Sequence, residues 1–461
     1  MKPQEASNSL KSTGARDLSV FCIPGVVRYR KSFLLFAFLI FGALVNLYLK
    51  EGFERLEFFP STDLYKFQLS GQRLLVGESM YWTAPAEQAV ESHCSKDGQL
   101  VSRSASGKPV GPSEPSLCLH PNLNPPVFGF VALLLADLSP SGVWWIWAIA
   151  SATASIVAFG LFARILTTKP FDQIVITIIS WIAFLLYYPS FAAYSLGQVT
   201  FILFLPLIAG WLALRKGQDF LAGAWIGLAA SLKPFFGLFL LLFFVGRYWR
   251  AATGFIFICF LALIGGAWLA GINSYFEYMS ILGDVTWLSA SWNGSIAGYL
   301  DRIFKGIGGD SASHIIWLSG AIKIAIVSAV FLIGAGATVV TRTLDREVRA
   351  DIIFGLAIPA MLLISPLGWL YYYPFLFLTF YAVAAQSTPL SHSVRYRLLI
   401  AVAIAMTAVP TPLLPGYTLS SPLEWFWDAG RYTYALLIGF GLIVFIAIRL
   451  GMSKPEVQAA A

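Results

Sequence analysis

The sequence predicts an all-α protein that crosses a lipid bilayer many times, and three observations lead to this fold class. Asp, Glu, Lys and Arg make up 12% of the 461 residues, about half of the roughly 25% that is typical of soluble domains. Hydrophobic residues reach 57%, and the mean hydropathy is +0.72. Apolar runs of helical length follow one another along the chain. These features exclude a disordered chain, a coiled coil, a disulfide-rich secreted module and a typical cytosolic enzyme.

About 12 apolar runs are expected to be membrane helices, because backbone groups in lipid must be paired within a helix. A crossing needs about 20 apolar residues, and the shorter runs would have to tilt or be covered by neighbours. Segment 126–138 is apolar but too short, and we interpret it as a re-entrant or interfacial helix, since a full crossing would invert every later loop. The expected spans cover 33–49, 143–163, 172–189, 198–214, 219–232, 234–246, 251–270, 315–340, 351–364, 370–385, 397–411 and 431–448.

Basic residues predict the side of the membrane that each loop faces. With 12 spans, 19 of the 31 Lys and Arg residues fall on one side, in short loops and the two tails. Short loops rich in Lys and Arg stay in the cytoplasm, so the tails 1–31 and 449–461 are expected inside. Segments 50–142, 271–314 and 412–430 are then outside. The chain 1–461 is expected to form one integral domain of a cell membrane.

The net charge of +7 does not predict a nucleic-acid partner, because the charges lie between apolar runs and suit anionic lipid. No Gly-rich phosphate loop, zinc-protease motif or Ser/His/Asp set is present, and no metal or cofactor is expected. His93, Cys94, Cys118 and His120 have spacings that suit zinc. A disulfide bond between Cys94 and Cys118 is the favoured interpretation, because their loop is expected to face an oxidising space.

The first outer segment opens with an amphipathic helix at 63–77. Its apolar residues share one helical face, and Lys66 and Arg73, seven residues apart, share another. Such a helix lies at the membrane surface with its basic side chains available to lipid phosphates. Asp63 stands at its N-terminal edge. There a carboxylate either caps the helix, as the Ser and Thr before it also can, or takes part in chemistry.

Three further positions fall at predicted outer helix ends. Lys233 lies between two apolar runs and breaks the basic-inside pattern. It either extends its ammonium toward water or binds a lipid phosphate. Arg302 either pairs with the neighbouring Asp301 or binds a phosphate as well. Trp369 belongs to an aromatic cluster that either forms part of the interfacial belt or stacks on a sugar.

The order and spacing of several short pieces resemble glycosyltransferase family 87, which includes mycobacterial mannosyltransferases that use polyprenol-phosphate-mannose. The resemblance covers most of the chain from about residue 58 to residue 380. The pieces are Ser-Thr-Asp-Leu-Tyr at 61–65, the segment 71–77 with Tyr81, Asn-Pro-Pro at 124–126, Gly197-Gln198, the segment 221–234, Ser-Trp-Asn-Gly-Ser at 291–295 with Arg302, and Ser365-Pro366 with Trp369.

The resemblance implies a GT-C-type membrane glycosyltransferase fold with its active site on the outer face. It implies that Asp63 is the catalytic base and that the donor is a polyprenyl-phosphate sugar, mannose or another hexose. Lys233 and Arg302 would bind the donor phosphate, and a lipid or glycan would be the acceptor. One carboxylate indicates a single displacement, hence inversion. The substrate-lining candidates are Tyr65, Lys66, Arg73, Gln198, Asn293, Ser295, Trp369, Tyr371 and Tyr372.

One departure from the family pattern affects the acceptor. Members often carry a His pair after the Ser-Pro-x-x-Trp piece, and this chain has Tyr371 and Tyr372 there. Two other classes of function stay open. A transporter or flippase of lipid-linked sugars would show buried charges at mid-membrane and repeated broken helices, and neither is apparent. The second open class is a surface-polysaccharide polymerase or ligase.

Cys94 and Cys118 are expected to form a disulfide bond in the outer segment. The two residues lie 24 positions apart, and closing such a loop stabilises a fold by about 3 kcal/mol. Mass spectrometry of non-reduced peptides should detect the linked pair. Two free thiols, or a zinc ion shared by them, would contradict this expectation.

Overall fold

The structure is a computed structural model, and it describes residues 30–57, 62–81, 122–283, 287–305, 316–385, 394–408 and 422–452. Within these residues all regular elements are α or 3-10 helices, and the β-type pairing found there is an isolated bridge between Asn293 and Trp369. The all-α prediction is therefore confirmed. The predicted disulfide pair, Cys94 and Cys118, lies outside the described residues, as do most of both tails.

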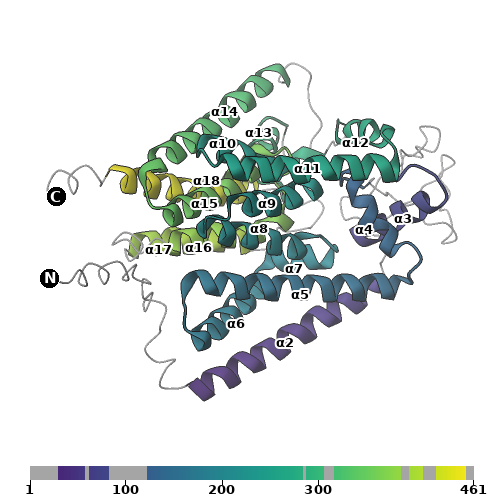
Figure 1. The fold of residues 1–461 in the computed structure, drawn as a ribbon, viewed down its shortest axis with the longest axis horizontal. Helices are drawn as coiled ribbons and strands as arrows, with labels where there is room; N and C mark the ends of the chain where they lie inside the picture. Colours follow the sequence, from purple (N-terminus) through teal and green to yellow (C-terminus); the bar gives the residue numbers. More distant parts are fainter. Residues whose placement is uncertain are drawn as a thin grey trace, which may run out of the picture.

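The helices run mostly along one direction, and the short elements gather at their ends (Figure 1). Three of the short elements, α3, α4 and α12, lie together at one end of the bundle, and the last turns of α18 lie at the other (Figure 1). The bundle helices are α2 (Arg30–Glu57), α5 (Pro140–Leu166), α6 (Pro170–Leu186), α8 (Thr200–Arg215), α9 (Asp219–Leu232), α10 (Leu238–Val245), α11 (Trp249–Ala270), α14 (Ile316–Val340), α15 (Arg346–Ile364), α16 (Leu376–Ala385), α17 (Val394–Ala408) and α18 (Pro422–Met452). The short elements are α3 (Asp63–Leu75), η4 (Pro126–Phe128), α4 (Gly129–Leu135), α7 (Tyr188–Ser195), η5 (Pro234–Gly237), α12 (Asn273–Gly283), η6 (Trp287–Ser289), α13 (Ile296–Lys305), η7 (Thr341–Thr343) and η8 (Leu370–Phe375).

Four described helices are long and apolar enough to cross a bilayer, and a bent helix pair could form a fifth crossing. The four are Pro140–Leu166, Trp249–Ala270, Gly320–Thr343 and Trp427–Met452, and the pair is Pro170–Leu186 with Tyr188–Ser195, bent by 71°. The predicted count of about 12 is not confirmed. One reason is length: a helix such as α9 has 14 residues and is about 21 Å long, against a bilayer core of about 30 Å.

Prolines stand at two helix breaks close to the candidate site. A proline disfavours helical backbone at the residue before it, and α9 accordingly ends at Leu232, because Pro234 leaves Lys233 in an extended conformation. The break between α6 and α7 falls at Tyr187, and Pro189 occupies the first turn of α7, where its missing N–H leaves no helical hydrogen bond unmade. Both breaks bring main-chain bends and polar groups to helix ends.

Small residues allow two helices of the bundle to pack with their backbones in contact. Gly223 and Gly227 of α9 lie one turn apart and face the main chain of α11, and Gly254 of α11 faces the main chain of α9. A Cβ atom at any of the three would overlap a backbone atom. Such small-residue contacts are the usual means of close helix pairing in membranes.

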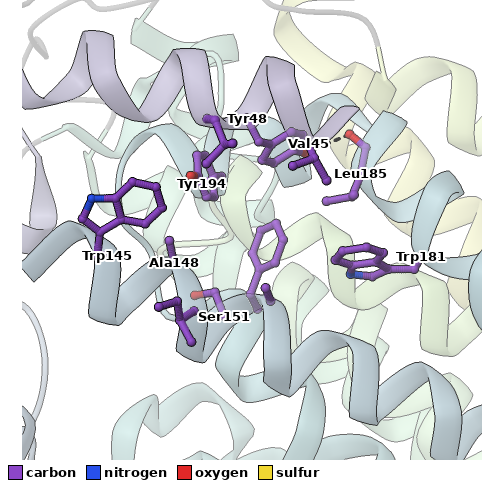
Figure 2. Close-up of a pocket in the computed structure, with 12 residues that line it drawn as sticks. Val45, Tyr48, Trp145, Ala148, Ser151, Trp181, Leu185 and Tyr194 are labelled. Carbon is purple, nitrogen blue, oxygen red and sulfur yellow. Dashed lines mark hydrogen bonds between the residues drawn. The ribbon is translucent and has the colours of Figure 1, made fainter. Parts of the chain in front are cut away.

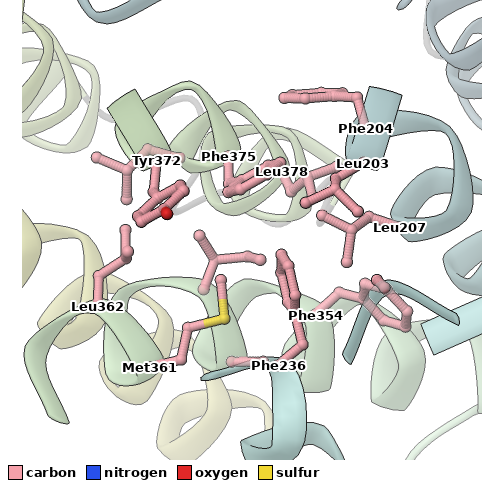
Figure 3. Close-up of a cluster of buried hydrophobic side chains, with 14 of the residues drawn as sticks. Leu203, Phe204, Leu207, Phe236, Phe354, Met361, Leu362, Tyr372, Phe375 and Leu378 are labelled. Atoms are coloured by element: carbon pink, nitrogen blue, oxygen red, sulfur yellow. The ribbon is translucent and has the colours of Figure 1, made fainter. Parts of the chain in front are cut away.

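A buried cluster of apolar side chains joins α8, α15, η5 and η8 in the centre of the bundle (Figure 3). Phe204 of α8 stacks on Phe375 of η8 with ring centroids 5.7 Å apart, and Phe236 of η5 meets the same ring edge-on at 5.4 Å. Phe354 of α15 lies in the same cluster (Figure 3). This packing fixes η8, which carries Tyr371 and Tyr372.

Paired charges close the end of the bundle where α8 finishes. Arg215 donates to both carboxylate oxygens of Asp351 at 2.5 Å and to Glu347 at 2.9 Å. Trp211 donates to the same Asp351 at 2.8 Å. Arg349 donates to a backbone carbonyl at 2.7 Å. Several of the predicted cytoplasmic basic residues therefore gather at one end of α8.

The short apolar segment 126–138 folds as η4 and α4, and both pack against α3. Gln68 and Gln72 of α3 donate to the carbonyls of Leu138 and Ala136 at 2.6 and 3.1 Å. Gly71 of α3 lies so close to the main chain of α4 that a Cβ atom would overlap it. The expected re-entrant or interfacial position of segment 126–138 stays a prediction.

The start of α3 docks on the turn between α7 and α8. The Asp63 N–H donates to the Leu196 carbonyl at 2.9 Å, and the Leu64 side chain is fully buried. Gly197 has a φ of 72°, and a Cβ atom there would overlap Leu64. The turn thus needs glycine for its backbone conformation and for the close approach of α3.

Gly197→Ala is expected to destabilise the protein more than Gly271→Ala. Both positions have positive φ, but nothing lies within 4 Å of a Cβ at Gly271. Left-handed strain alone costs about 1–2 kcal/mol, and overpacking against Leu64 adds about 1–3 kcal/mol. Thermal unfolding in detergent should show the larger loss for Gly197→Ala, and equal losses would contradict the proposed docking contact.

Candidate active site

Thr62, not Asp63, caps helix α3. The Thr62 backbone is extended, and its hydroxyl accepts from the Tyr65 N–H at 3.4 Å. Asp63 is the first helical residue, and its carboxylate does not serve the cap. The interpretation of Asp63 as an N-cap is therefore wrong. A carboxylate in the first turn is still favoured by the helix dipole.

The Asp63 carboxylate is held from two directions. Lys66, one turn along α3, donates to Oδ1 at 2.7 Å. The Gln198 side-chain amide donates to Oδ2 from the docking turn. The Asp63 side chain nevertheless keeps 21% of its surface exposed, so one carboxylate is both fixed in place and open to an incoming molecule.

Lys233 brings a buried positive charge toward this carboxylate. It lies between α9 and η5, outside both apolar helices, and is 6% exposed. Its Nζ is 5.5 Å from the centroid of the Tyr372 ring. Burial lowers the pKa of the Lys233 ammonium to about 8, the Asp63 charge opposes this shift, and the Lys66 charge adds to it. Asp63, Lys66 and Lys233 thus form one electrostatic group.

Tyr371 and Tyr372 belong to the same group. Both phenols lie within electrostatic range of Asp63. Thr200, the first residue of α8, donates to the Tyr371 carbonyl at 2.7 Å. The Trp369 ring lies 5.3 Å from the Tyr371 ring and 6.2 Å from the nearly parallel Tyr372 ring. Tyr371 and Tyr372 therefore lie near the predicted base.

Asn293 and Ser295 are fully buried, and their contacts are with the turn that leads to Trp369. Asn293 Nδ2 donates to the Pro366 carbonyl at 2.8 Å, and Ser295 Oγ donates to the same oxygen at 3.1 Å. The Leu370 N–H donates to the carbonyl of Trp292 at 3.0 Å. These contacts position the 365–370 turn, and a substrate-lining role for either residue stays a prediction.

Arg302 and Arg73 both form hydrogen bonds with backbone carbonyls of the protein. The Arg302 guanidinium is 1% exposed and donates to the carbonyls of Ala429 and Ala290, both at 2.7 Å. Its neighbour Asp301 pairs with Lys323 of α14. Arg73 donates to the Ser79 carbonyl and pairs with Glu78 at 3.1 Å.

The positions of these two arginines differ from that of Asp63. Arg73 lies ten residues along α3 from Asp63, about 15 Å by helix rise. The role of Arg302 as a donor-phosphate ligand stays a prediction. Tyr65 is half-buried beside Asp63 on α3.

Among the described residues, no group of three or more His, Cys, Asp or Glu could hold a metal ion.

An apolar cavity of about 190 Å³ lies behind the docking turn, between α2, α5, α6, α7 and α8 (Figure 2). Tyr194 of α7 and Phe201 of α8 line it, and they flank the segment that carries Gln198 and Thr200. Trp145, Trp181 and Leu185 form other parts of its wall (Figure 2). The cavity and the polar group thus share one stretch of backbone.

The sequence interpretation missed one charged residue at this end of the bundle. Arg431 lies near the start of α18 and is 1% exposed. An arginine at the beginning of the last apolar run, on the predicted outer side, breaks the basic-inside pattern in the same way as Lys233, and this signal was present in the sequence.

Comparison with known proteins identifies the family. Residues 122–366 match glycosyltransferase family 87, which is more than half of the chain. The match includes Gln198, Lys233, Asn293, Ser295 and Arg302, whereas α3 with Asp63 lies before it and Trp369, Tyr371 and Tyr372 lie just after it. No curated protein and no solved structure matches the chain. The family match covers the central helices that carry Lys233 and the docking turn, and the chain belongs to glycosyltransferase family 87.

Proposed function

We propose that this glycosyltransferase moves a hexose, such as mannose, from a polyprenyl-phosphate donor to a lipid or glycan acceptor. The observation that carries the proposal is the group formed by Asp63, Lys66 and Lys233 next to two tyrosines. It combines a partly exposed carboxylate with a buried cation at the end of an apolar bundle. A hydroxyl acceptor and a phosphate leaving group need these two kinds of side chain.

The chemistry is a single displacement at the anomeric carbon of the sugar. The acceptor hydroxyl forms the new C–O bond, Asp63 takes its proton, and the bond from the anomeric carbon to the phosphate oxygen breaks. Lys233 stabilises the charge that develops on the departing phosphate, in surroundings where water is scarce. Attack and departure on opposite faces invert the anomeric centre.

Two features of the fold support a lipid-linked donor on the outer side of a cell membrane. The apolar cavity beside the docking turn suits a hydrocarbon chain, and its wall residue Phe201 directly follows Thr200, which bonds the Tyr371 carbonyl. The basic residues around Arg215 lie at the far end of α8 from Thr200, 15 residues and about 22 Å away. With basic loops in the cytoplasm, the end that carries Asp63 faces outward.

Asp63→Asn is expected to slow sugar transfer by roughly 100-fold or more, the usual scale for the loss of a general base. Asparagine keeps the shape of the side chain but cannot take the proton. The measurement is transfer of labelled sugar from polyprenyl phosphate to membrane lipids by the purified variant.

Thr62→Ala is the matched control, because it removes the cap of the same helix and leaves the carboxylate. Loss of an N-cap costs about 1 kcal/mol of stability, so this variant should melt earlier but keep most of its turnover. Near wild-type turnover by Asp63→Asn would show that Asp63 is structural.

Donor binding is expected to weaken as the pH rises through about 8, the pKa to which burial lowers Lys233. Below that pH the ammonium is charged and attracts the phosphate, and above it the attraction is lost. Lys233→Met should raise the KM for the donor on the order of 10- to 100-fold and should remove this pH dependence. Lys233→Arg, which stays charged, should bind donor at higher pH.

Lys216→Met is the control for this experiment, because it removes an exposed lysine at the other end of α8. It should leave both the KM and its pH profile unchanged. An unchanged profile in Lys233→Met would mean that the donor phosphate binds elsewhere.

A further inference from the structure

Arg431 is a buried cation that forms no ion pair with any of the described carboxylates. It lies near the start of α18 and is 1% exposed. Its guanidinium donates through Nη2 to the Tyr432 hydroxyl at 3.3 Å, and its Nε is buried with no hydrogen-bond partner. A guanidinium has five N–H donors, so most of its donor capacity is unused within the described residues.

Aromatic contacts alone do not account for this residue. The Arg431 guanidinium lies 4.8 Å from the Tyr432 ring centroid and 5.8 Å from that of Trp427. Such contacts contribute about 0.5–2 kcal/mol, whereas an unpaired buried charge costs several kcal/mol. They also supply no acceptor for Nε. A charge held at this cost in an apolar helix indicates a functional role.

The surrounding structure holds Arg431 in a fixed place. Arg302 of α13 donates to the carbonyl of Ala429, two residues before Arg431. Tyr188 of α7 lies within electrostatic range of the guanidinium. Arg302 therefore links α13 to the turn of α18 that carries Arg431.

Lys233 and Arg431 are linked to different members of the tyrosine triplet 371–373. Tyr371 and Tyr372 are within electrostatic range of Asp63, and Lys233 lies over the Tyr372 ring. Tyr373 contacts the Tyr432 ring with centroids 5.3 Å apart, and Tyr432 is the neighbour of Arg431. The two buried cations therefore lie at two different positions around the candidate site.

We propose that Arg431 binds the phosphate group of a second membrane lipid, so that the enzyme holds one lipid phosphate at Lys233 and another at Arg431. The planar guanidinium can donate two parallel hydrogen bonds to phosphate oxygens. The position of Arg431 near the start of the last apolar helix suits a lipid headgroup. That this second lipid is the acceptor of the sugar rests on the proposed function. That it binds at Arg431 does not.

The test measures lipid binding to the full-length protein without any transfer reaction. Purified protein in neutral detergent is titrated with short-chain phosphatidylglycerol, and the thermal unfolding midpoint is recorded in the Lys233→Met background, which removes the other cation. Diacylglycerol, which lacks phosphate, and inorganic phosphate, which lacks the chains, are the two comparison probes.

In this background phosphatidylglycerol should raise the midpoint with a saturable dose, and diacylglycerol should not. Adding Arg431→Met should weaken the response on the order of 10- to 100-fold in lipid concentration. Without lipid, the same substitution should leave the midpoint unchanged or higher, because methionine removes an unpaired buried charge. Arg431→Lys should respond at intermediate concentrations.

Arg449→Met is the matched control, because Arg449 is an exposed arginine near the other end of the same helix. It should leave the lipid response intact. The proposal is overturned if Arg431→Met responds like Arg449→Met, or if inorganic phosphate reproduces the full effect of the lipid. If Arg431→Met does not fold, an Arg431→Lys variant with an unaltered lipid response overturns it instead.

This result is independent of the proposed transfer reaction. Full turnover in Asp63→Asn would reject the base and leave the binding at Arg431 untouched. Loss of lipid binding only in Arg431→Met would support the second site whichever sugar is transferred.

Discussion

The docking of α3 on the turn between α7 and α8 is the constraint on which the candidate site depends. The Asp63 N–H bonds the Leu196 carbonyl, and the Gln198 amide bonds the Asp63 carboxylate. Two residues beyond Gln198, Thr200 fixes the carbonyl of Tyr371. A single turn of the chain thus sets both the carboxylate, which lies outside the family match, and the aromatic wall. A shift of α3 by one residue would separate Asp63 from Lys233, since nothing else in α3 carries a carboxylate.

Buried charges are paired at one end of the bundle and unpaired at the other, among the described residues. At the end of α8, Arg215 and Asp351 neutralise each other with further hydrogen bonds, which is how a protein tolerates buried ions. At the site, Lys233 and Arg431 are buried and form no ion pair among the described residues. Unpaired cations lower stability but create a positive potential in a medium of low dielectric. The anionic phosphate groups proposed as ligands would neutralise these two cations.

The sequence predicted those features that depend on local pattern. Composition and apolar runs were sufficient for the all-α class, and Pro234 placed Lys233 at a helix break. The number of membrane crossings could not be predicted from the sequence, because a run of 14 apolar residues does not reveal whether neighbouring helices or lipid cover it. The contacts of Gln198 with Asp63 and of Arg302 with Ala429 join residues 135 and 127 positions apart, and no local pattern encodes them. The sequence left the identity of the cap open because Ser61, Thr62 and Asp63 are all of residue types that cap helices.

The presence of Tyr371 and Tyr372 limits the proton transfers that the candidate site can support. An imidazole titrates near neutral pH, whereas a phenol has an ordinary pKa of about 10. The tyrosines beside Asp63 can donate hydrogen bonds but hold no positive charge and accept no proton near pH 7. Lys66 and Lys233 then carry the positive charge of the group. Among Asp63, Lys66, Gln198, Lys233, Tyr371 and Tyr372, Asp63 is the one carboxylate, and the proposed function uses it to take the proton of the acceptor hydroxyl.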